Sequence, residues 1–108
     1  VKGWTNKDGS SSEKVYDVDL SSDAGSNTVD VETATYKNSI GEAQFVSFWS
    51  DPDFNPKEQS FYYVRVIEIP TPRWTTYDSV IFGNKLPEFI PSSQQERAYT
   101  SPIWYSPE

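Results

Sequence analysis

The sequence of 108 residues lacks the residue types with the richest side-chain chemistry: it has no cysteine, no histidine and no methionine. Without cysteine there is no disulfide and no thiolate nucleophile. Without histidine the chain has neither the commonest general base, nor the commonest zinc ligand, nor the usual partner of a catalytic serine. Catalysis by this chain alone would depend on Asp, Glu, Tyr, Lys or Arg, and no catalytic motif built from them is present.

Long apolar segments are also missing. No run approaches the roughly 20 residues that cross a bilayer, so we expect no membrane span. The chain opens Val1-Lys2-Gly3-Trp4, with neither a charged leader nor an apolar signal segment. We therefore expect it to be part of a longer protein.

Positive charge is scarce, because nine Lys and Arg face 16 Asp and Glu, giving a net charge of −7. Such a field repels phosphate groups, which argues against nucleic acid and anionic membranes as partners. Aromatic residues, in contrast, make up 16% of the chain and supply the large apolar areas that a core needs. The sequence predicts a single acidic, β-rich domain over residues 1–108.

Short segments rich in β-branched and aromatic residues predict strands separated by turn signals. These segments are 1–5, 13–20, 28–36, 43–50, 60–69 and 99–105, with a possible short strand at 79–82. Asn6-Lys7-Asp8-Gly9 is typical of a turn. The spacing predicts an all-β fold, an antiparallel β-sandwich of Ig-like or jelly-roll-like type, with Trp4, Trp49 and Trp104 in its core. No long amphipathic helix is predicted, only one helical turn in residues 92–97.

The last third of the chain is rich in proline. Pro70, Pro72, Pro87 and Pro91 interrupt any continuous ladder. They predict a long proline-rich C-terminal segment that wraps a surface, either of this domain or of a neighbouring one.

Residues 61–78, FYYVRVIEIPTPRWTTYD, combine the best predicted strand with a polar and aromatic cluster on a turn or loop. The cluster comprises Arg73, Trp74, Tyr77 and Asp78. Arg and Trp are residue types that anchor interfaces, and the nearby prolines limit the entropy lost on ordering them. Three interpretations are open: a loop folded back on its own sandwich, an interface with another domain, or a contact with a small molecule or glycan.

Arg65 lies inside an apolar strand. We expect it to form an ion pair with an acid on a neighbouring strand, with a contact across a domain interface as the alternative. The residues Lys2 and Lys85 have no desolvating neighbours in the sequence, so neither is expected to be a nucleophile.

Asp51, Asp53 and Asn55 form the pattern D-x-D-x-N, which begins like a calcium loop. Pro56 then stands where an EF-hand needs Gly, and Tyr62 where it needs Glu. An Asx-type turn is therefore favoured over calcium. The acidic pairs Asp17 with Asp19 and Asp30 with Glu32 are predicted to lie on solvated strand faces.

The order of these motifs resembles the C-terminal end of the bacterial proteins grouped as the domain-of-unknown-function family 3604. The resemblance spans nearly the whole chain and is carried by residues 1–4, 13–18, 27–36, 49–54, 61–78 and 95–105. It implies an exported, periplasmic or secreted protein whose upstream region is similar to PHP (polymerase and histidinol phosphatase) metal-dependent phosphoesterases. Any divalent metal would then belong to that upstream domain, because the presumed His-rich ligands match no position here.

The resemblance thus implies a non-catalytic portion without a cofactor of its own, which buttresses or caps a PHP-like hydrolase domain of the same protein. The alternative, from the exposed aromatics expected at Trp74, Tyr77 and Tyr99, is a module that binds carbohydrate or another ligand.

Overall fold

The computed structural model describes all residues from Val1 to Glu108, and its regular secondary structure consists mostly of short antiparallel strands with one short helix. The all-β class predicted from the sequence is therefore confirmed at this level. No helix has the length and apolar character needed to cross a bilayer. The chain divides into two compact units. Unit 1 contains Val1–Leu20, Phe45–Val66 and Ala98–Glu108, and unit 2 contains Ser21–Gln44 and Ile67–Arg97.

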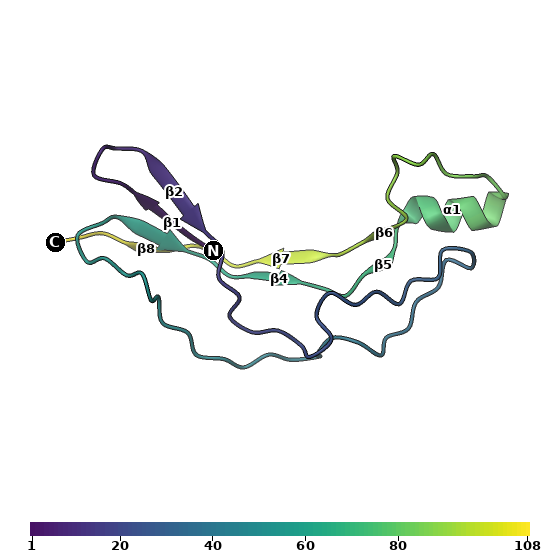
Figure 1. Ribbon diagram of the computed structural model, residues 1–108, viewed down its shortest axis with the longest axis horizontal. Helices are drawn as coiled ribbons and strands as arrows, with labels where there is room; N and C mark the ends of the chain where they lie inside the picture. The colour runs from purple at the N-terminus through teal and green to yellow at the C-terminus, as the bar shows by residue number, and fades with distance from the viewer. The chain divides into compact units, whose positions relative to one another are not determined.

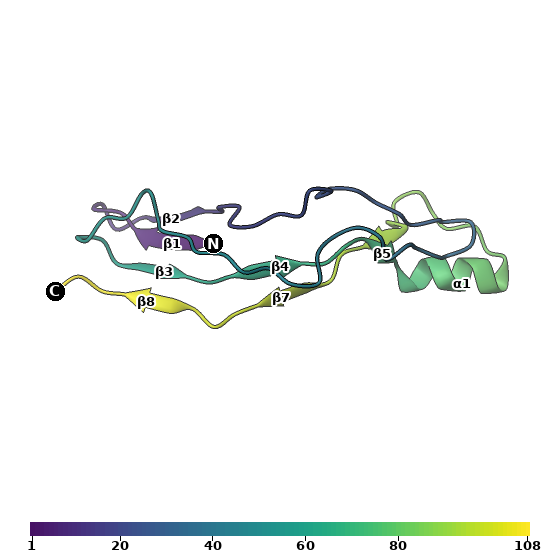
Figure 2. The same cartoon turned by 90° about the horizontal axis from the view of Figure 1, so that it is seen from below.

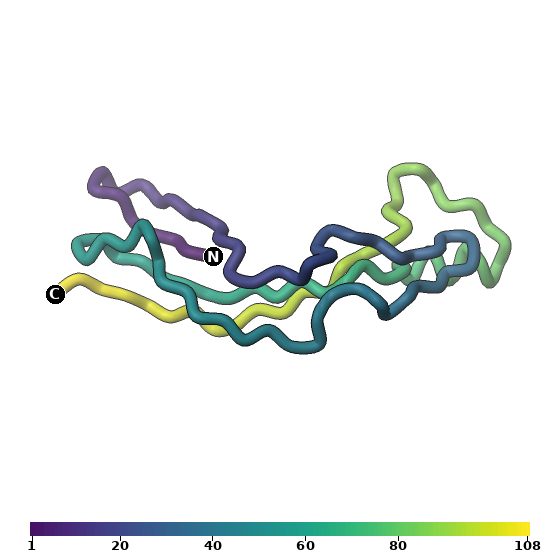
Figure 3. Tube along the Cα trace, turned by 60° about the horizontal axis from the view of Figure 1, so that its bottom comes forward, coloured from purple at the N-terminus to yellow at the C-terminus, as the bar shows by residue number.

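Unit 1 is built on a four-stranded antiparallel sheet in the order β2-β1-β3-β8 (Figures 1 and 2). Its strands are β1 (Lys2–Thr5), β2 (Ser11–Lys14), β3 (Ser60–Tyr62) and β8 (Ile103–Tyr105). The first two form a hairpin, visible as the purple end of the trace in Figure 3. The predicted turn closes this hairpin, since Asn6 N donates to Ser10 O at 2.8 Å.

The register of the sheet separates two faces with different chemistry. Gly3 lies opposite both Glu13 and Phe61, and Phe61 lies opposite Trp104. Since side chains alternate along a strand, these side chains share one face, which we call the aromatic face. The neighbouring rows, which begin at Lys2 and Trp4 in β1, point to the opposite side, which we call the clasp face.

A loop of the same unit covers the clasp face. The Tyr105 hydroxyl on β8 donates to Pro56 O at 3.0 Å, and the Tyr105 ring meets the Phe54 ring edge-on with centroids 5.0 Å apart. The Trp49 ring lies 6.4 Å from the Tyr62 ring. Residues 49–56 therefore occupy the position that a second sheet would take in a sandwich, on this face only.

The predicted strand at residues 60–69 is divided. β3 pairs with β1 and β8, whereas β4 (Arg65–Ile67) pairs with β7 (Arg97–Tyr99) in a separate two-stranded sheet. Between them Val64 N bonds to the Thr100 side chain, not to a neighbouring backbone, which interrupts the ladder. The predicted strand at 99–105 is divided in the same way, with Pro102 between β7 and β8.

Three predicted strands are absent or shortened. Of the second one, predicted at 13–20, only residues 13 and 14 are paired, as the end of β2. Residues 28–36 form a turn with a single bridge between Asp30 and Thr35, and residues 43–50 have no regular structure. Their alternation is real, but a strand also needs a neighbouring backbone to satisfy its N–H and C=O groups. Both acidic pairs lie exposed, as predicted, but in a loop and a turn and not on strand faces. Asp30 Oδ1 caps its turn by accepting from Glu32 N at 2.9 Å.

In unit 2 the region predicted as a turn or loop is a helix, α1 (Trp74–Phe82), so the loop at Arg73–Asp78 and the strand at 79–82 were both wrong (Figure 1). The helix ends at Gly83, whose φ of 67° is the left-handed conformation that glycine adopts without strain. The helical turn predicted at 92–97 is also wrong. Within it, β6 (Ser93–Gln94) pairs antiparallel with β5 (Thr71–Pro72), and Arg73 N donates to Ser92 O at 3.0 Å.

Candidate functional site: a lysine clasp and an open aromatic face

Lys2 lies at the centre of a polar cluster on the clasp face, which we call the lysine clasp. Its Nζ is 2.6 Å from Asp51 Oδ2 and donates to the Asp53 carbonyl oxygen at 2.8 Å. The two side chains of this ion pair are only 4% and 6% exposed. Lys2 was predicted to have no desolvating neighbours, but the fold supplies them, since the rings of Trp4 and Tyr62 lie 5.2 and 5.9 Å from its Nζ.

Hydrogen bonds from two tyrosines complete the clasp. The Tyr62 hydroxyl donates to Asp51 Oδ2 at 2.7 Å, and the Tyr16 hydroxyl donates to Asp53 Oδ2 at 2.8 Å. Lys14 pairs with the same Asp53 oxygen at 2.5 Å, but this outer pair is about half exposed. The clasp thus joins β1, β2 and β3 to the loop that covers them.

The pKa values describe a charged pair at rest. Burial opposes ionisation of Asp51, but the hydrogen bonds from Lys2 and Tyr62 outweigh it, so the pKa of Asp51 lies below its ordinary value. Burial likewise works against the charge of Lys2, yet the hydrogen bond to Asp51 and the nearby acidic groups leave the pKa of Lys2 raised. Burial, followed by the hydrogen bond to Asp53, raises the pKa of Tyr16.

This electrostatic state favours a structural role. A nucleophilic or basic lysine needs its neutral form, which requires a lowered pKa. Lys2 has the opposite shift, and its ammonium already donates to two oxygens. The clasp is arranged to hold strands and loop together.

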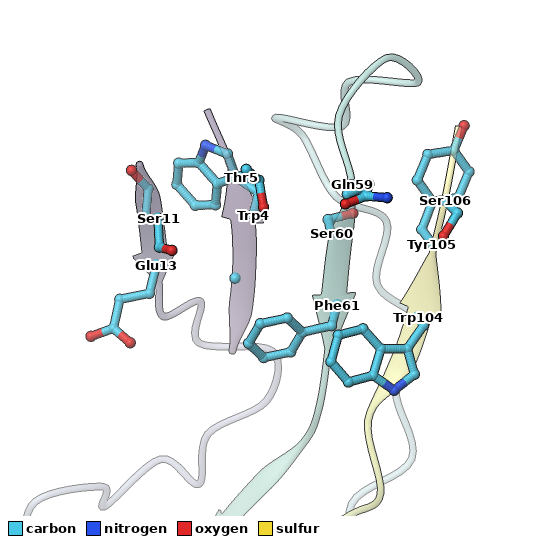
Figure 4. A pocket seen from close by; sticks show the side chains of 12 residues that line it. Trp4, Thr5, Ser11, Glu13, Gln59, Ser60, Phe61, Trp104, Tyr105 and Ser106 are labelled. Carbon is cyan, nitrogen blue, oxygen red and sulfur yellow. The ribbon is translucent and has the colours of Figure 1, made fainter. Parts of the chain in front are cut away.

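The other side of the sheet is open and lined by aromatic rings. Phe61 and Trp104 lie with centroids 5.2 Å apart, Phe61 and Tyr63 are stacked at 6.4 Å, and Tyr63 meets Tyr99 at 6.1 Å. Figure 4 shows Phe61 reaching across the sheet toward β1 with Trp104 beside it. Trp104 is 72% exposed, so its predicted place in the core is wrong. A shallow hollow on this sheet is lined by Phe61, Trp104, Gly3 and the polar Ser11, Glu13 and Gln59, among others.

A comparison with models of protein families identifies the family of this chain. The model of the family described as "Protein of unknown function (DUF3604)" matches residues 1–107. The chain belongs to this family. No curated protein and no solved structure matches it.

In this DUF3604 chain three of the five predicted interface residues share one element, and Arg73 and Arg65 lie outside it. Trp74, Tyr77 and Asp78 lie exposed on α1, and Arg73 is the half-buried residue that precedes the helix. Arg65 on β4 is exposed and takes part in neither of the two salt bridges of the chain, so the expected ion pair is wrong. The neighbouring strand β7 contains no acidic residue that could pair with it.

The oxygens of the D-x-D-x-N segment are already engaged. Asp51 Oδ1 accepts from Asp53 N at 2.8 Å and Asn55 Oδ1 accepts from Lys57 N at 3.1 Å, which are the predicted Asx turns. The carboxylates of Asp51 and Asp53 meet Lys2 and Lys14. No group of three or more acidic side chains converges on a point that would hold a metal ion.

Sequence reasoning missed the clasp and the aromatic face. The clasp had one usable signal, the aromatic residues beside Lys2 and near Asp51 in the sequence, but nothing paired these two segments. The aromatic face had a stronger one, because Phe61 and Tyr63 alternate within the densest strand of the sequence.

Proposed function

We propose that this DUF3604 chain is a non-catalytic, β-rich portion of a longer exported protein, and that it buttresses or caps a PHP-like metal-dependent hydrolase domain of the same polypeptide. The observation that carries the proposal is the asymmetry of the four-stranded sheet. One face is closed by the loop and the lysine clasp, whereas the other presents the exposed ring of Trp104 beside the half-buried ring of Phe61, and the rings of Tyr63 and Tyr99 continue this row beyond the sheet.

The size of the solvent-accessible surface supports the proposal that another domain covers part of this chain. The chain exposes 8491 Å² for a mass of 12.3 kDa. A compact monomer of that mass exposes roughly 6,100 Å², and two separate compact units of half the mass together expose roughly 7,400 Å². In addition, 22 of the larger hydrophobic side chains are exposed. An excess of total surface together with many exposed apolar side chains is typical of a chain that another domain covers.

In this proposal the aromatic face is the inner layer of a β-sandwich that is completed in the whole protein. Two sheets in a sandwich pack about 10 Å apart through interdigitating side chains. The Phe61 and Trp104 rings have the size and position for such a layer. Any divalent metal would be held by the hydrolase domain, since the acids of the clasp are paired with lysines.

The test uses the full-length protein and the excised chain. The full-length protein is expected to hydrolyse phosphoesters with divalent metal, and the excised chain is expected to be inactive. Replacing both Phe61 and Trp104 with Ser in the full-length protein should lower the melting temperature of the hydrolase domain, because a packed apolar interface is lost. Phe89→Ser, at an exposed apolar residue of unit 2, is the control that should leave it unchanged. Hydrolysis of phosphoesters by the excised chain would overturn the proposal. An unchanged melting temperature of the hydrolase domain after the double substitution would also overturn it.

A second candidate function is carbohydrate binding. It is favoured by the hollow on the aromatic face, where the ring of Trp104 adjoins polar groups including Glu13 and Gln59. Aromatic faces stack on sugars while polar side chains bond their hydroxyls. Affinity electrophoresis in polysaccharide gels tests this idea. If a polysaccharide slows the migration of the natural protein but not that of Trp104→Ala, the result supports carbohydrate binding at this face. If the two proteins migrate equally in every polysaccharide gel, the result excludes it.

A further inference from the structure

Helix α1 packs with its polar side inward. Thr76 is fully buried, Thr75 is 8% exposed, and the Thr76 hydroxyl donates to Ser92 O at 2.6 Å. The half-buried Ser79 lies on the same side, since residues three and four apart share a face. The inner side of the helix is therefore made of hydroxyl groups and not of the apolar residues that usually face a core.

The apolar residues of the helix lie on the outer side. Trp74, Tyr77 and Ile81 stand at i, i+3 and i+7, which form one stripe at 3.6 residues per turn. Their side chains are 63%, 41% and 72% exposed. Asp78, four residues after Trp74, lies in this stripe and forms no salt bridge. We call these four residues the outer stripe.

We infer that the outer stripe of α1 inserts into an apolar groove, with a cationic side chain on its rim, that belongs to another domain of the same polypeptide. The inference rests on the proposed function and names the docking element and the chemistry of its receptor. Amphipathic helices are recognised in this way, with anchors at i, i+3 and i+7 in a hydrophobic groove. The rim cation is required because Asp78 would otherwise be desolvated without a partner.

The size of the stripe favours a linked domain over a free partner. A helix of nine residues is about 14 Å long, and a stripe about 10 Å wide covers roughly 140 Å². A stable complex between separate proteins buries about 800 Å² on each partner. A covalently linked domain needs far less, because the tether supplies a high effective concentration.

Charge argues against a second copy of this chain as the occupant. In a two-fold contact across the outer stripe, Asp78 would face or neighbour the Asp78 of the other copy. The chain as a whole carries a charge of −7, so the approach of a second copy is also opposed at long range. An apolar groove with a basic rim would bury the apolar side chains of the outer stripe and pair with the Asp78 carboxylate.

The helix is already ordered for docking. Gly83 ends it in the left-handed conformation, Pro72 lies just before it in β5, and Thr76 fixes its inner side to Ser92. Because this order exists before contact, the stripe loses little conformational entropy on insertion.

The test places the photo-crosslinker benzoylphenylalanine at Ile81 in the full-length protein, with the same group at Phe89 as the matched control. Both positions are exposed apolar residues of unit 2. After irradiation, peptide mapping is expected to join position 81 to a peptide outside the present chain, while position 89 gives at least fivefold less product. Asp78→Lys is expected to lower the yield at position 81 at least fivefold, whereas Asp78→Glu should largely preserve it.

A third probe at Trp104 separates this inference from the proposed function. Crosslinking from position 104 but not from position 81 would overturn the inference and leave the proposed function standing. Absence of crosslinks at both positions would overturn both. A crosslinked product of doubled mass would show that the outer stripe contacts a second copy of the protein. A crosslink within the present chain would show that the stripe packs against this chain itself. An unchanged crosslinking yield in Asp78→Lys would show that no cationic side chain lies beside Asp78. Each of these results contradicts the inference as stated.

Discussion

The Lys2 ammonium lies 2.6 Å from the Asp51 carboxylate, and both side chains are more than nine-tenths buried. The pair joins the first strand of the sheet to the loop that covers one of its faces. Buried apolar side chains are few in this chain, namely Ala34 and Pro72. Polar contacts such as this pair therefore carry much of the order in unit 1.

Asp51→Ala should destabilise the full-length protein by about 2–3 kcal/mol, because it leaves the Lys2 ammonium buried without a counter-ion. We set the figure near the lower end of the range for buried pairs because a single loop covers the site. Urea unfolding followed by circular dichroism measures the change.

Two comparisons make this prediction specific. Asp53→Ala removes the carboxylate that meets Lys14 at the exposed edge of the clasp, and it should cost clearly less than Asp51→Ala. The double variant Lys2→Met with Asp51→Leu removes both charges and should recover much of the loss. If Asp51→Ala and Asp53→Ala lower the free energy of unfolding equally, the result would contradict a special contribution of the buried Asp51 to stability.

The stability of the clasp should depend on pH at both extremes. The folded-state pKa of Asp51 is below its ordinary 3.8, so its contribution is complete above that value and is lost as the pH falls through the lowered pKa. The folded-state pKa of Lys2 is above its ordinary 10.5, so its contribution is complete below that value and is lost as the pH rises through the raised pKa. Between these limits the contribution should be constant.

The urea midpoint of the natural protein, measured from pH 7 to pH 2, tests the acid limb. Four other aspartates also have lowered pKa values, namely Asp8, Asp23, Asp30 and Asp53. The informative quantity is therefore the difference from Asp51→Asn, which keeps the shape of the side chain but does not titrate. That difference should shrink as the pH falls below about 4. A difference independent of pH would contradict the lowered pKa of Asp51.

Local sequence predicted the features that depend on local chemistry. The first strand, the Asn6–Gly9 turn, and the strand character around Phe61 and Tyr105 are confirmed. The partners of Lys2 could not be predicted in this way, because Asp51 approaches it only through the pairing of β1 with β3. The same holds for the open and closed faces of the sheet, which depend on where residues 49–56 return.

Helix α1 was missed because its composition argues for a strand. Thr, Tyr, Val, Ile and Phe have weak helix propensity and favour strands. The bounding signals were nevertheless in the sequence, with Pro72 shortly before the helix and Gly83 just after it, the pattern expected at helix ends. Burial of Thr75 and Thr76 against the rest of unit 2 then stabilises the helix, which intrinsic helix propensity alone does not.

Adjacent isosteric substitutions should differ in their effect on the stability of unit 2. Thr76→Val removes the hydroxyl that donates to Ser92 O and should cost about 1 kcal/mol. The Thr75 hydroxyl is buried without a hydrogen-bond partner, so Thr75→Val should be neutral or stabilising. Thermal melts of both variants check the prediction, and the shared change from Thr to Val cancels the difference in helix propensity. A larger loss for Thr75→Val than for Thr76→Val would contradict the assignment of the hydrogen bond to Thr76 and of the unpartnered hydroxyl to Thr75.

Gly3→Ala should disturb the aromatic face. A Cβ atom at Gly3 would lie 2.5 Å from Phe61 Cε1 and Cζ, closer than such atoms approach in proteins. The Phe61 ring would have to move away from Gly3, and its contacts with Tyr63 and Trp104 would change. We expect a loss of about 1–3 kcal/mol in urea unfolding, together with a changed near-ultraviolet circular dichroism signal from the ring cluster. In a Phe61→Leu background the same Gly3→Ala change should cost much less, because the shorter side chain leaves room for the methyl group. An equal cost in both backgrounds would show that Gly3 is needed for its backbone alone and not to seat the Phe61 ring.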